Sequence, residues 1–260
     1  MLVIFLAYAC YIESWRRLLA GWGQRIGYAD AARAWCLANL GRYLPGKIWG
    51  VTGLVVLAGR AGVRGSAAAA SAVAFQALVL GTGVAAVAVA TPHATSALRL
   101  GDGFLVAVAS LGALVWAPTG RMLGRLVDSA SPLPPLPVSA VALGGIAMLL
   151  GWLAYGLSFW LLAHGLLPDV HIPLATAVGI FILGYILGTL AVLVPGGLGV
   201  RELVLISLLT PVLGSGGAVA ASIGSRVMLT ITEASAALMT VALVRKPSPE
   251  GSSEPSQPNS

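Results

Sequence analysis

Two short segments place proline and glycine beside fixed charges within an otherwise apolar sequence. The first break is Arg42-Tyr-Leu-Pro-Gly-Lys47, and the second break is Val194-Pro-Gly-Gly-Leu-Gly-Val-Arg-Glu202. Unpaired backbone groups are costly in hydrocarbon, so a break of this kind must be buried by protein or line a wet cavity. Interrupted apolar segments at corresponding positions in two halves of a chain are typical of a transport site.

The first break has the chemistry of an anion site. Proline is favoured at the first position of a helix, so Pro45, with Gly46 after it, predicts the start of a short helix. A helix N-terminus offers free N–H groups and a partial positive charge, and Arg42 and Lys47 flank this one. These four residues are candidates for binding a phosphate. The alternative is that the two cations only mark the cytoplasmic interface of the membrane.

The second break combines glycines, which permit many backbone conformations, with two charged residues in an apolar stretch. Pro195 is followed by three residues that permit unusual torsions and close backbone approach, which are Gly196, Gly197 and Gly199. Arg201 and Glu202 then fall in the first turn of an apolar helix. A charge at membrane depth is a candidate functional residue. The alternative is an internal ion pair that only stabilises the helix bundle.

The last apolar stretch carries four polar residues at helical spacing, which are Ser222, Arg226, Thr230 and Glu233. They share one face of a helix, and such a face must point into the protein. Arg226 and Glu233 are two turns apart, which is too far for an ideal mutual pair. We therefore expect each to find a partner at the second break, Arg226 with Glu202 or Glu233 with Arg201.

The composition indicates an all-α, polytopic transmembrane helix bundle. Hydrophobic residues make up 58% of the chain and charged residues only 9%, against about 25% charged in soluble domains. The net charge of +6 comes from basic residues at the ends of apolar stretches, so we expect no nucleic-acid partner. Cys10 and Cys36 lack the spacing of metal ligands, and we expect no metal and no cofactor.

Hydrophobicity predicts six spans and two half-length helices that end within the bilayer. The predicted spans are residues 2–19, 67–90, 104–117, 139–163, 173–194 and 218–244. A span needs about 20 residues, so residues 48–58 and 200–209 are predicted to be re-entrant. Residues 21–41 are expected to form an amphipathic interfacial helix. A transmembrane domain over residues 1–246 would then precede a disordered tail at 247–260.

Two questions of topology stay open in the sequence. Arg245 and Lys246 place the C-terminus in the cytoplasm, whereas six spans from an outside N-terminus would place it outside. Either residues 195–217 also cross the membrane or one predicted span is wrong. The similarity of residues 44–48 to 194–198 suggests an inverted repeat, with chance as the alternative.

Residues 41–50 and 188–202 resemble the two signature regions of the lysylphosphatidylglycerol synthase transmembrane-region family, which is also described as flippase-like. Its best-known members move aminoacylated phosphatidylglycerol between leaflets, and relatives are linked to other phospholipids or to polyprenyl-linked sugars. The soluble aminoacyl-transferase domain of some members is missing here, so the resemblance does not imply synthase activity. It implies eight functional positions, which are Pro45, Gly46, Pro195, Gly196, Gly197, Gly199, Arg201 and Glu202.

These observations predict a flippase of a bacterial inner membrane that transfers an anionic phospholipid or a polyprenyl-linked glycolipid. Arg42, Lys47 and Arg201 would hold the headgroup phosphate, and the path would be lined by Glu202, Arg226 and Glu233. No catalytic constellation is readable, which favours a transporter over an enzyme. The alternatives are a polyprenyl-phosphate glycosyltransferase, which needs acidic loop residues, and a non-catalytic partner of an envelope lipid enzyme. Membrane lipids and a separate lipid-modifying enzyme are the expected partners.

Overall fold

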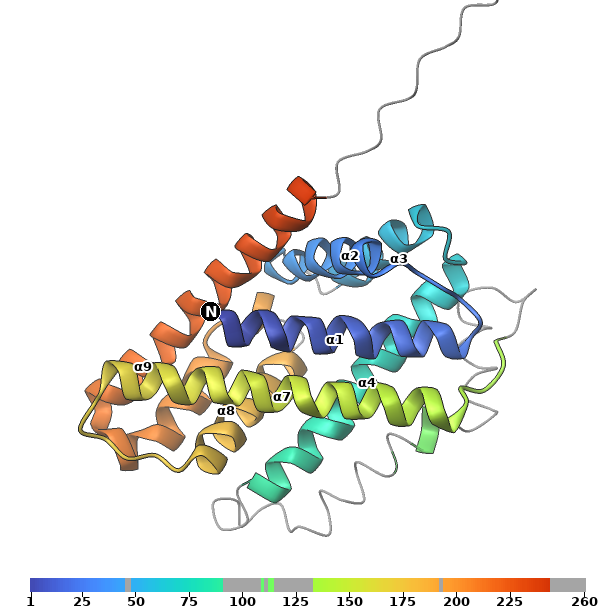
Figure 1. The fold of residues 1–260 in the computed structure, drawn as a ribbon. Coiled ribbons are helices and arrows are strands. Elements are labelled where there is room, and N and C mark those ends of the chain that lie inside the picture. The colour runs from blue at the N-terminus through green and yellow to red at the C-terminus, as the bar shows by residue number, and fades with distance from the viewer. Residues whose placement is uncertain (45–47, 91–108, 110–111, 115–132, 192–193, 244–260) are drawn as a thin grey trace, which may run out of the picture.

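The computed structural model describes residues 1–44, 48–90, 109, 112–114, 133–191 and 194–243, and this part of the chain contains helices and no strand. The predicted all-α bundle is confirmed (Figure 1). Two short 3₁₀ turns, η1 (Gly41–Tyr43) and η2 (Pro195–Gly197), fall at the two breaks. The helices are α1 (Leu2–Gly21), α2 (Tyr28–Leu40), α3 (Ile48–Arg60), α4 (Gly65–Ala90), α7 (Val138–Leu166), α8 (Leu174–Leu190) and α9 (Val200–Leu243).

Three of the described helices, α4, α7 and α9, are long and apolar enough to cross a membrane. The apolar helix α8 is shorter, at 17 residues, because it ends at Leu190 and not at residue 194 as predicted. α1, which covers the predicted span 2–19, has 20 residues but is not one of these three helices. Its second half carries charges, because Glu13 pairs there with Arg16 and Arg17 at 2.6 Å each. Most of the predicted span 104–117 and the predicted tail lie outside the described residues.

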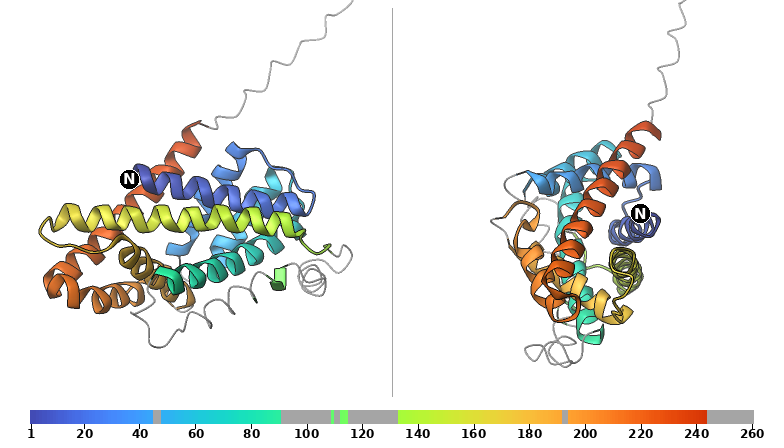
Figure 2. Two further views of the ribbon diagram at one scale, coloured as in Figure 1. Left: turned by 60° about the horizontal axis from the view of Figure 1, so that its bottom comes forward. Right: turned by 90° about the vertical axis from the view of Figure 1, so that its left-hand side faces the viewer.

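A pair of long helices, α1 and α7, forms the scaffold of the bundle. They lie side by side and run in opposite directions (Figures 1 and 2). Two buried indoles attach this pair to α4, because Trp15 Nε1 donates to Ser71 Oγ at 2.8 Å and Trp152 Nε1 donates to Thr82 Oγ1 at 3.2 Å. Buried tryptophans usually satisfy their N–H in this way. The scaffold is therefore fixed by specific hydrogen bonds as well as by apolar packing.

The first break lies between the two arms of a helical hairpin. Its arms, α2 and α3, pack against each other so closely that a Cβ added at Gly41 would lie 2.8 Å from the Gly50 nitrogen. The helix predicted over residues 21–41 corresponds to α2, which begins only at Tyr28, and its interfacial position stays a prediction. α2 also packs on α1 and α9 and buries Ala31, Ala34 and Trp35, so its apolar face meets protein.

The second break is the tip of a similar hairpin, made by α8 and the first part of α9. Gly214 adopts φ 69° and ψ 168°, which divides α9 into a proximal arm (residues 200–213) and a distal arm (residues 215–243). The predicted half-helix 200–209 therefore runs on to residue 213, and the helix predicted from 218 begins earlier. On α8, Gly184 and Gly188 face Leu205 and Arg201 of the proximal arm, and small residues four apart permit this close approach.

The close packing of α7 on α8 predicts a position-specific cost of adding a methyl group. Gly156→Ala would place its Cβ 2.7 Å from the Val178 Cα, and backbone of this kind cannot move aside easily. We expect a loss of about 1–3 kcal/mol in the free energy of unfolding, measured by thermal unfolding in detergent. Gly165→Ala is the matched control, because it lies on the same helix with nothing within 4 Å. Equal stability of the two variants would contradict this packing.

Candidate functional site

The tips of the two hairpins meet. A Cβ added at Gly196 would lie 3.7 Å from the Arg42 carbonyl oxygen and 3.8 Å from Cδ1 of Tyr43. The first tip is therefore the turn Gly41–Tyr43, and the second tip is the turn Pro195–Gly197. Two segments about 150 residues apart in the sequence thus form one local structure.

The glycines of the second break have the unusual torsions that the sequence predicts. Gly196, Gly197 and Gly199 have φ values of 59°, 65° and 83°, in the left-handed region that favours glycine. Gly197 is also confined by its surroundings, since an added Cβ would lie 2.6 Å from the carbonyl oxygen of Gly188. Both the torsion and the space at this position require glycine.

The distal arm of α9 holds both tips. Arg226 donates to the Gly196 carbonyl oxygen at 3.1 Å and to Glu202 Oε1 at 3.2 Å, so the predicted Arg226–Glu202 pair is confirmed. The predicted pair of Glu233 with Arg201 is wrong, because Glu233 forms its ion pair with Arg42 of the first tip. Two helical turns separate Arg226 from Glu233. Arg226 therefore lies at the second tip, whereas Glu233 lies farther along the helix, at the first tip.

Tyr43 completes the contact at the first tip. Its hydroxyl donates to Glu233 Oε2 at 2.6 Å and lies 3.3 Å from Thr230 Oγ1. The polar face predicted for the last helix therefore meets the two tips. Tyr43 was not among the predicted site residues, although its position next to Arg42 in the first break is a signal that could have included it.

Glu202 has a second role besides its pair with Arg226. Its Oε2 accepts a hydrogen bond of 2.7 Å from the backbone N–H of Gly199, three residues earlier. A glutamate at this position of a helix satisfies an N–H that has no partner within the helix. Glu202 therefore fixes the start of α9 as well as the position of Arg226.

Arg201 is the buried cation of the site without a counter-charge. Its residue is only 6% exposed, and among the described residues it forms no salt bridge. Its guanidinium makes a long hydrogen bond of 3.4 Å to Ser225 Oγ and lies 4.8 Å from the centroid of the Phe181 ring. Its Nε has no hydrogen-bond partner in the described part of the chain. Buried charges are normally paired, so this group has the capacity to bind an anion.

A central cavity of about 610 Å³ adjoins these residues. Sites for small ligands commonly have about 300–1,000 Å³. The charged lining comes from the two tips and α9, and consists of Arg42, Arg201, Arg226 and Glu233. Helices α3 and α4 contribute much of the apolar lining, which includes Val51, Leu54, Ala72, Val73, Phe75, Val79 and Leu80, and aromatic side chains of other helices add to it. One cavity thus offers positive charge and an apolar wall.

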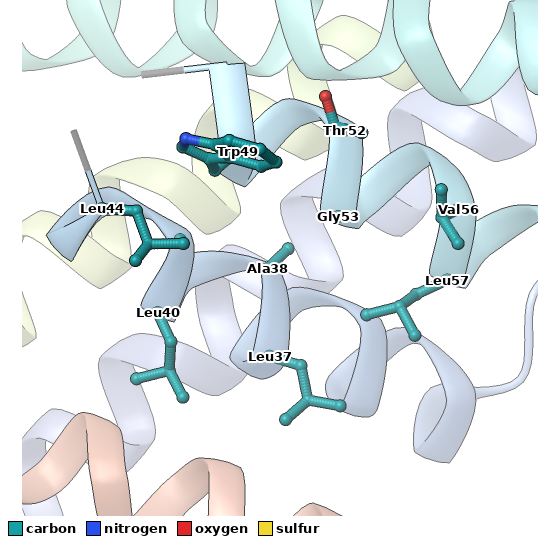
Figure 3. A pocket seen from close by; sticks show the side chains of 10 residues that line it. Leu37, Ala38, Leu40, Leu44, Trp49, Thr52, Gly53, Val56 and Leu57 are labelled. Carbon is teal, nitrogen blue, oxygen red and sulfur yellow. The ribbon is translucent and has the colours of Figure 1, made fainter. Parts of the chain in front are cut away.

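A second, uncharged groove of about 540 Å³ lies between the arms of the first hairpin (Figure 3). Side chains of α2 and α3 line it, among them Leu37, Leu40, Trp49 and Val56. Its lining residues in the described part of the chain include no charged side chain. Of the predicted charged residues that the structure describes, Arg42, Arg201, Arg226 and Glu233 line the central cavity, Glu202 lies outside its lining, and none lines this groove. The predicted residues Pro45, Gly46 and Lys47 lie outside the described residues.

The arrangement of the pairs predicts which charges depend on each other. In a double-mutant cycle, Arg42→Gln and Glu233→Gln should show a coupling of about 0.5–3 kcal/mol in unfolding stability, because each residue leaves the other as an unpaired buried charge. The cycle of Arg201→Gln with Glu233→Gln is the control and should be closer to additive. Thermal unfolding in detergent measures both cycles. Stronger coupling of Glu233 to Arg201 would restore the pairing predicted from the sequence.

Comparison with known proteins identifies the family. No curated protein and no solved structure matches the chain. A family model described as the lysylphosphatidylglycerol synthase TM region matches residues 1–234, which include both hairpins and the distal arm as far as Glu233. This match confirms the resemblance of residues 41–50 and 188–202. The chain is therefore a membrane protein that belongs to the lysylphosphatidylglycerol synthase TM region family.

Proposed function

We propose that this protein is a flippase that transfers a lipid with a phosphate-containing headgroup between the leaflets of a bacterial inner membrane. The lipid is an anionic phospholipid or a polyprenyl-linked glycolipid. The observation that carries the proposal is Arg201, a buried cation without a counter-charge beside a cavity that also has an apolar wall. The proposed orientation places the C-terminus in the cytoplasm, next to Arg245 and Lys246.

A phosphate is the ligand that best matches Arg201. The planar guanidinium presents paired N–H donors whose geometry fits phosphate oxygens. Among its described residues the site contains three arginines and two glutamates, and the two ion pairs account for each of these charges except that of Arg201. A headgroup phosphate would supply the missing negative charge. Lys47, five residues after Arg42 in the sequence, would add a further cation.

The apolar lining supports a lipid over a soluble anion. Val73, Phe75 and Val79 of α4 line the same cavity as Arg201, so an amphiphilic ligand would meet a suitable surface with each of its parts. Transporters commonly bind their substrates where interrupted helices meet, as the two hairpin tips do here. A separate lipid-modifying enzyme that supplies the lipid is the proposed partner.

Transport also fits the carboxylates better than glycosyl transfer does. Glu233 is the carboxylate that lines the cavity within the described part of the chain, and Arg42 and Tyr43 both bind it. Glu202 is held by Arg226 and by the backbone of Gly199. A polyprenyl-phosphate glycosyltransferase would need an acidic group available for a metal or for a sugar nucleotide.

A reconstituted transport assay with lipids of different headgroups tests the proposal. We expect Arg201→Ala and Glu202→Ala to abolish transfer of the preferred phospholipid while the protein is still inserted and expressed. Arg201→Lys should retain part of the activity, since it keeps the charge but loses the paired donors. Arg60→Ala is the control, because it removes an exposed arginine at the end of α3.

Two results would contradict this assignment. Full transfer activity in Arg201→Ala would show that the buried cation does not bind the headgroup. Loss of monodisperse protein in detergent for Arg201→Ala and Glu202→Ala would indicate that these charges only stabilise the bundle.

A further inference from the structure

Glu233 occupies the donors of the first tip that an anionic ligand would use. Its residue is 3% exposed, and its two carboxylate oxygens are bound separately. Oε1 forms the ion pair with Arg42, and Oε2 accepts the hydrogen bond from the Tyr43 hydroxyl. A guanidinium and a hydroxyl are also a suitable set of donors for a phosphate. The carboxylate of Glu233 thus stands where a ligand oxygen could bind.

We propose that Glu233 is a built-in competitor of the headgroup, which an anionic lipid must displace from Arg42 and Tyr43 in order to bind. This inference rests on the proposed function, and it makes Glu233 a residue that determines specificity. A neutral headgroup has no negative charge with which to replace the carboxylate. Only an anionic headgroup can restore the pairing of Arg42 after Glu233 leaves.

Arg201 provides the first contact for such an exchange. It lines the same cavity as Arg42 and Glu233, and its Nε has no partner among the described residues. A phosphate bound there would bring negative charge into the cavity that Glu233 lines. Like charges repel strongly where water is scarce, so the bound anion would weaken the contact of Glu233 with Arg42.

The second glutamate of the site is less suited to this role. Glu202 is tied to its own helix by the 2.7 Å hydrogen bond from Gly199 N–H, and its partner Arg226 also binds the Gly196 carbonyl. Glu233, in contrast, makes its ion pair and its hydrogen bond with residues of another element, Arg42 and Tyr43 of the first tip. Displacement of Glu233 would therefore remove the ion pair between the first tip and the distal arm and leave the contact of Tyr43 with Thr230, while Arg226 still binds the second tip.

Binding measurements on the purified full chain in detergent test the proposal. The probes are a short-chain phosphatidylglycerol, inorganic phosphate and a short-chain diacylglycerol, which is neutral. We expect Glu233→Gln to tighten binding of the phosphatidylglycerol roughly tenfold, within the range common for coupled sites, and to leave binding of the diacylglycerol unchanged. If only phosphatidylglycerol binds more tightly, the anion that competes with Glu233 is a lipid headgroup. If only inorganic phosphate binds more tightly, the competing anion is a free phosphate.

Three further variants separate competition from a general effect of charge. Glu202→Gln changes the net charge equally but leaves Arg42 paired, so we expect less tightening than in Glu233→Gln. Glu13→Gln, at a glutamate that pairs with Arg16 and Arg17 in α1, should have no effect. Glu233→Asp keeps every charge and both donors but shortens the side chain, which weakens its contacts with Arg42 and Tyr43. It should tighten binding by a smaller factor, and it does not depend on the folding of Glu233→Gln.

The outcomes distinguish this inference from the proposed function. Two results would overturn the competitor role, which are equal tightening in Glu233→Gln and Glu202→Gln, and no tightening in either Glu233→Gln or Glu233→Asp. In both cases, binding of phosphatidylglycerol by the wild type would still support the proposed site. If neither the wild type nor any variant binds an anion, the proposed function fails and the inference fails with it. Binding by Glu233→Gln but not by the wild type would support the competitor role most directly.

Discussion

The structure depends on one helix that pairs charges from two distant segments of the chain. Arg226 and Glu233 lie two turns apart on the distal arm of α9, and each contacts a different hairpin tip. Inside an apolar protein an unpaired charge or carbonyl group is costly, so these contacts decide where the two broken segments can stand. The position of the first tip relative to the second therefore follows from the spacing of two residues on a third element.

The remaining helices permit this arrangement through small residues. α8 approaches the proximal arm of α9 at Gly184 and Gly188, and Gly41, directly after α2, approaches α3. The long pair α1 and α7, fixed to α4 by Trp15 and Trp152, provides the frame on which both hairpins pack. In a membrane protein, where apolar surroundings give little hydrophobic drive between helices, such close packing contributes much of the stability.

The central cavity combines two properties that separate elements supply. The hairpin tips and α9 contribute charges, and α3 and α4 contribute apolar side chains. Only the fold brings these together, because residue 73 and residue 201 are far apart in the sequence. After the two ion pairs form, the positive charge of Arg201 has no protein counter-charge among the described residues, and the cavity is accordingly suited to an amphiphilic anion.

The sequence by itself determined the membrane class, the all-α fold and the family, since these follow from composition, from hydrophobic runs and from the two Pro-Gly segments. It also indicated the site residues Arg42, Arg201, Glu202, Arg226 and Glu233, because charges in apolar stretches are conspicuous. Tertiary structure alone decided that residues 21–41 include the arm of a hairpin, that α9 bends at Gly214 and that Glu233 pairs with Arg42. Helical spacing shows which side chains share a face, but a partner on another element is chosen by packing, and packing depends on contacts between residues that no local pattern connects.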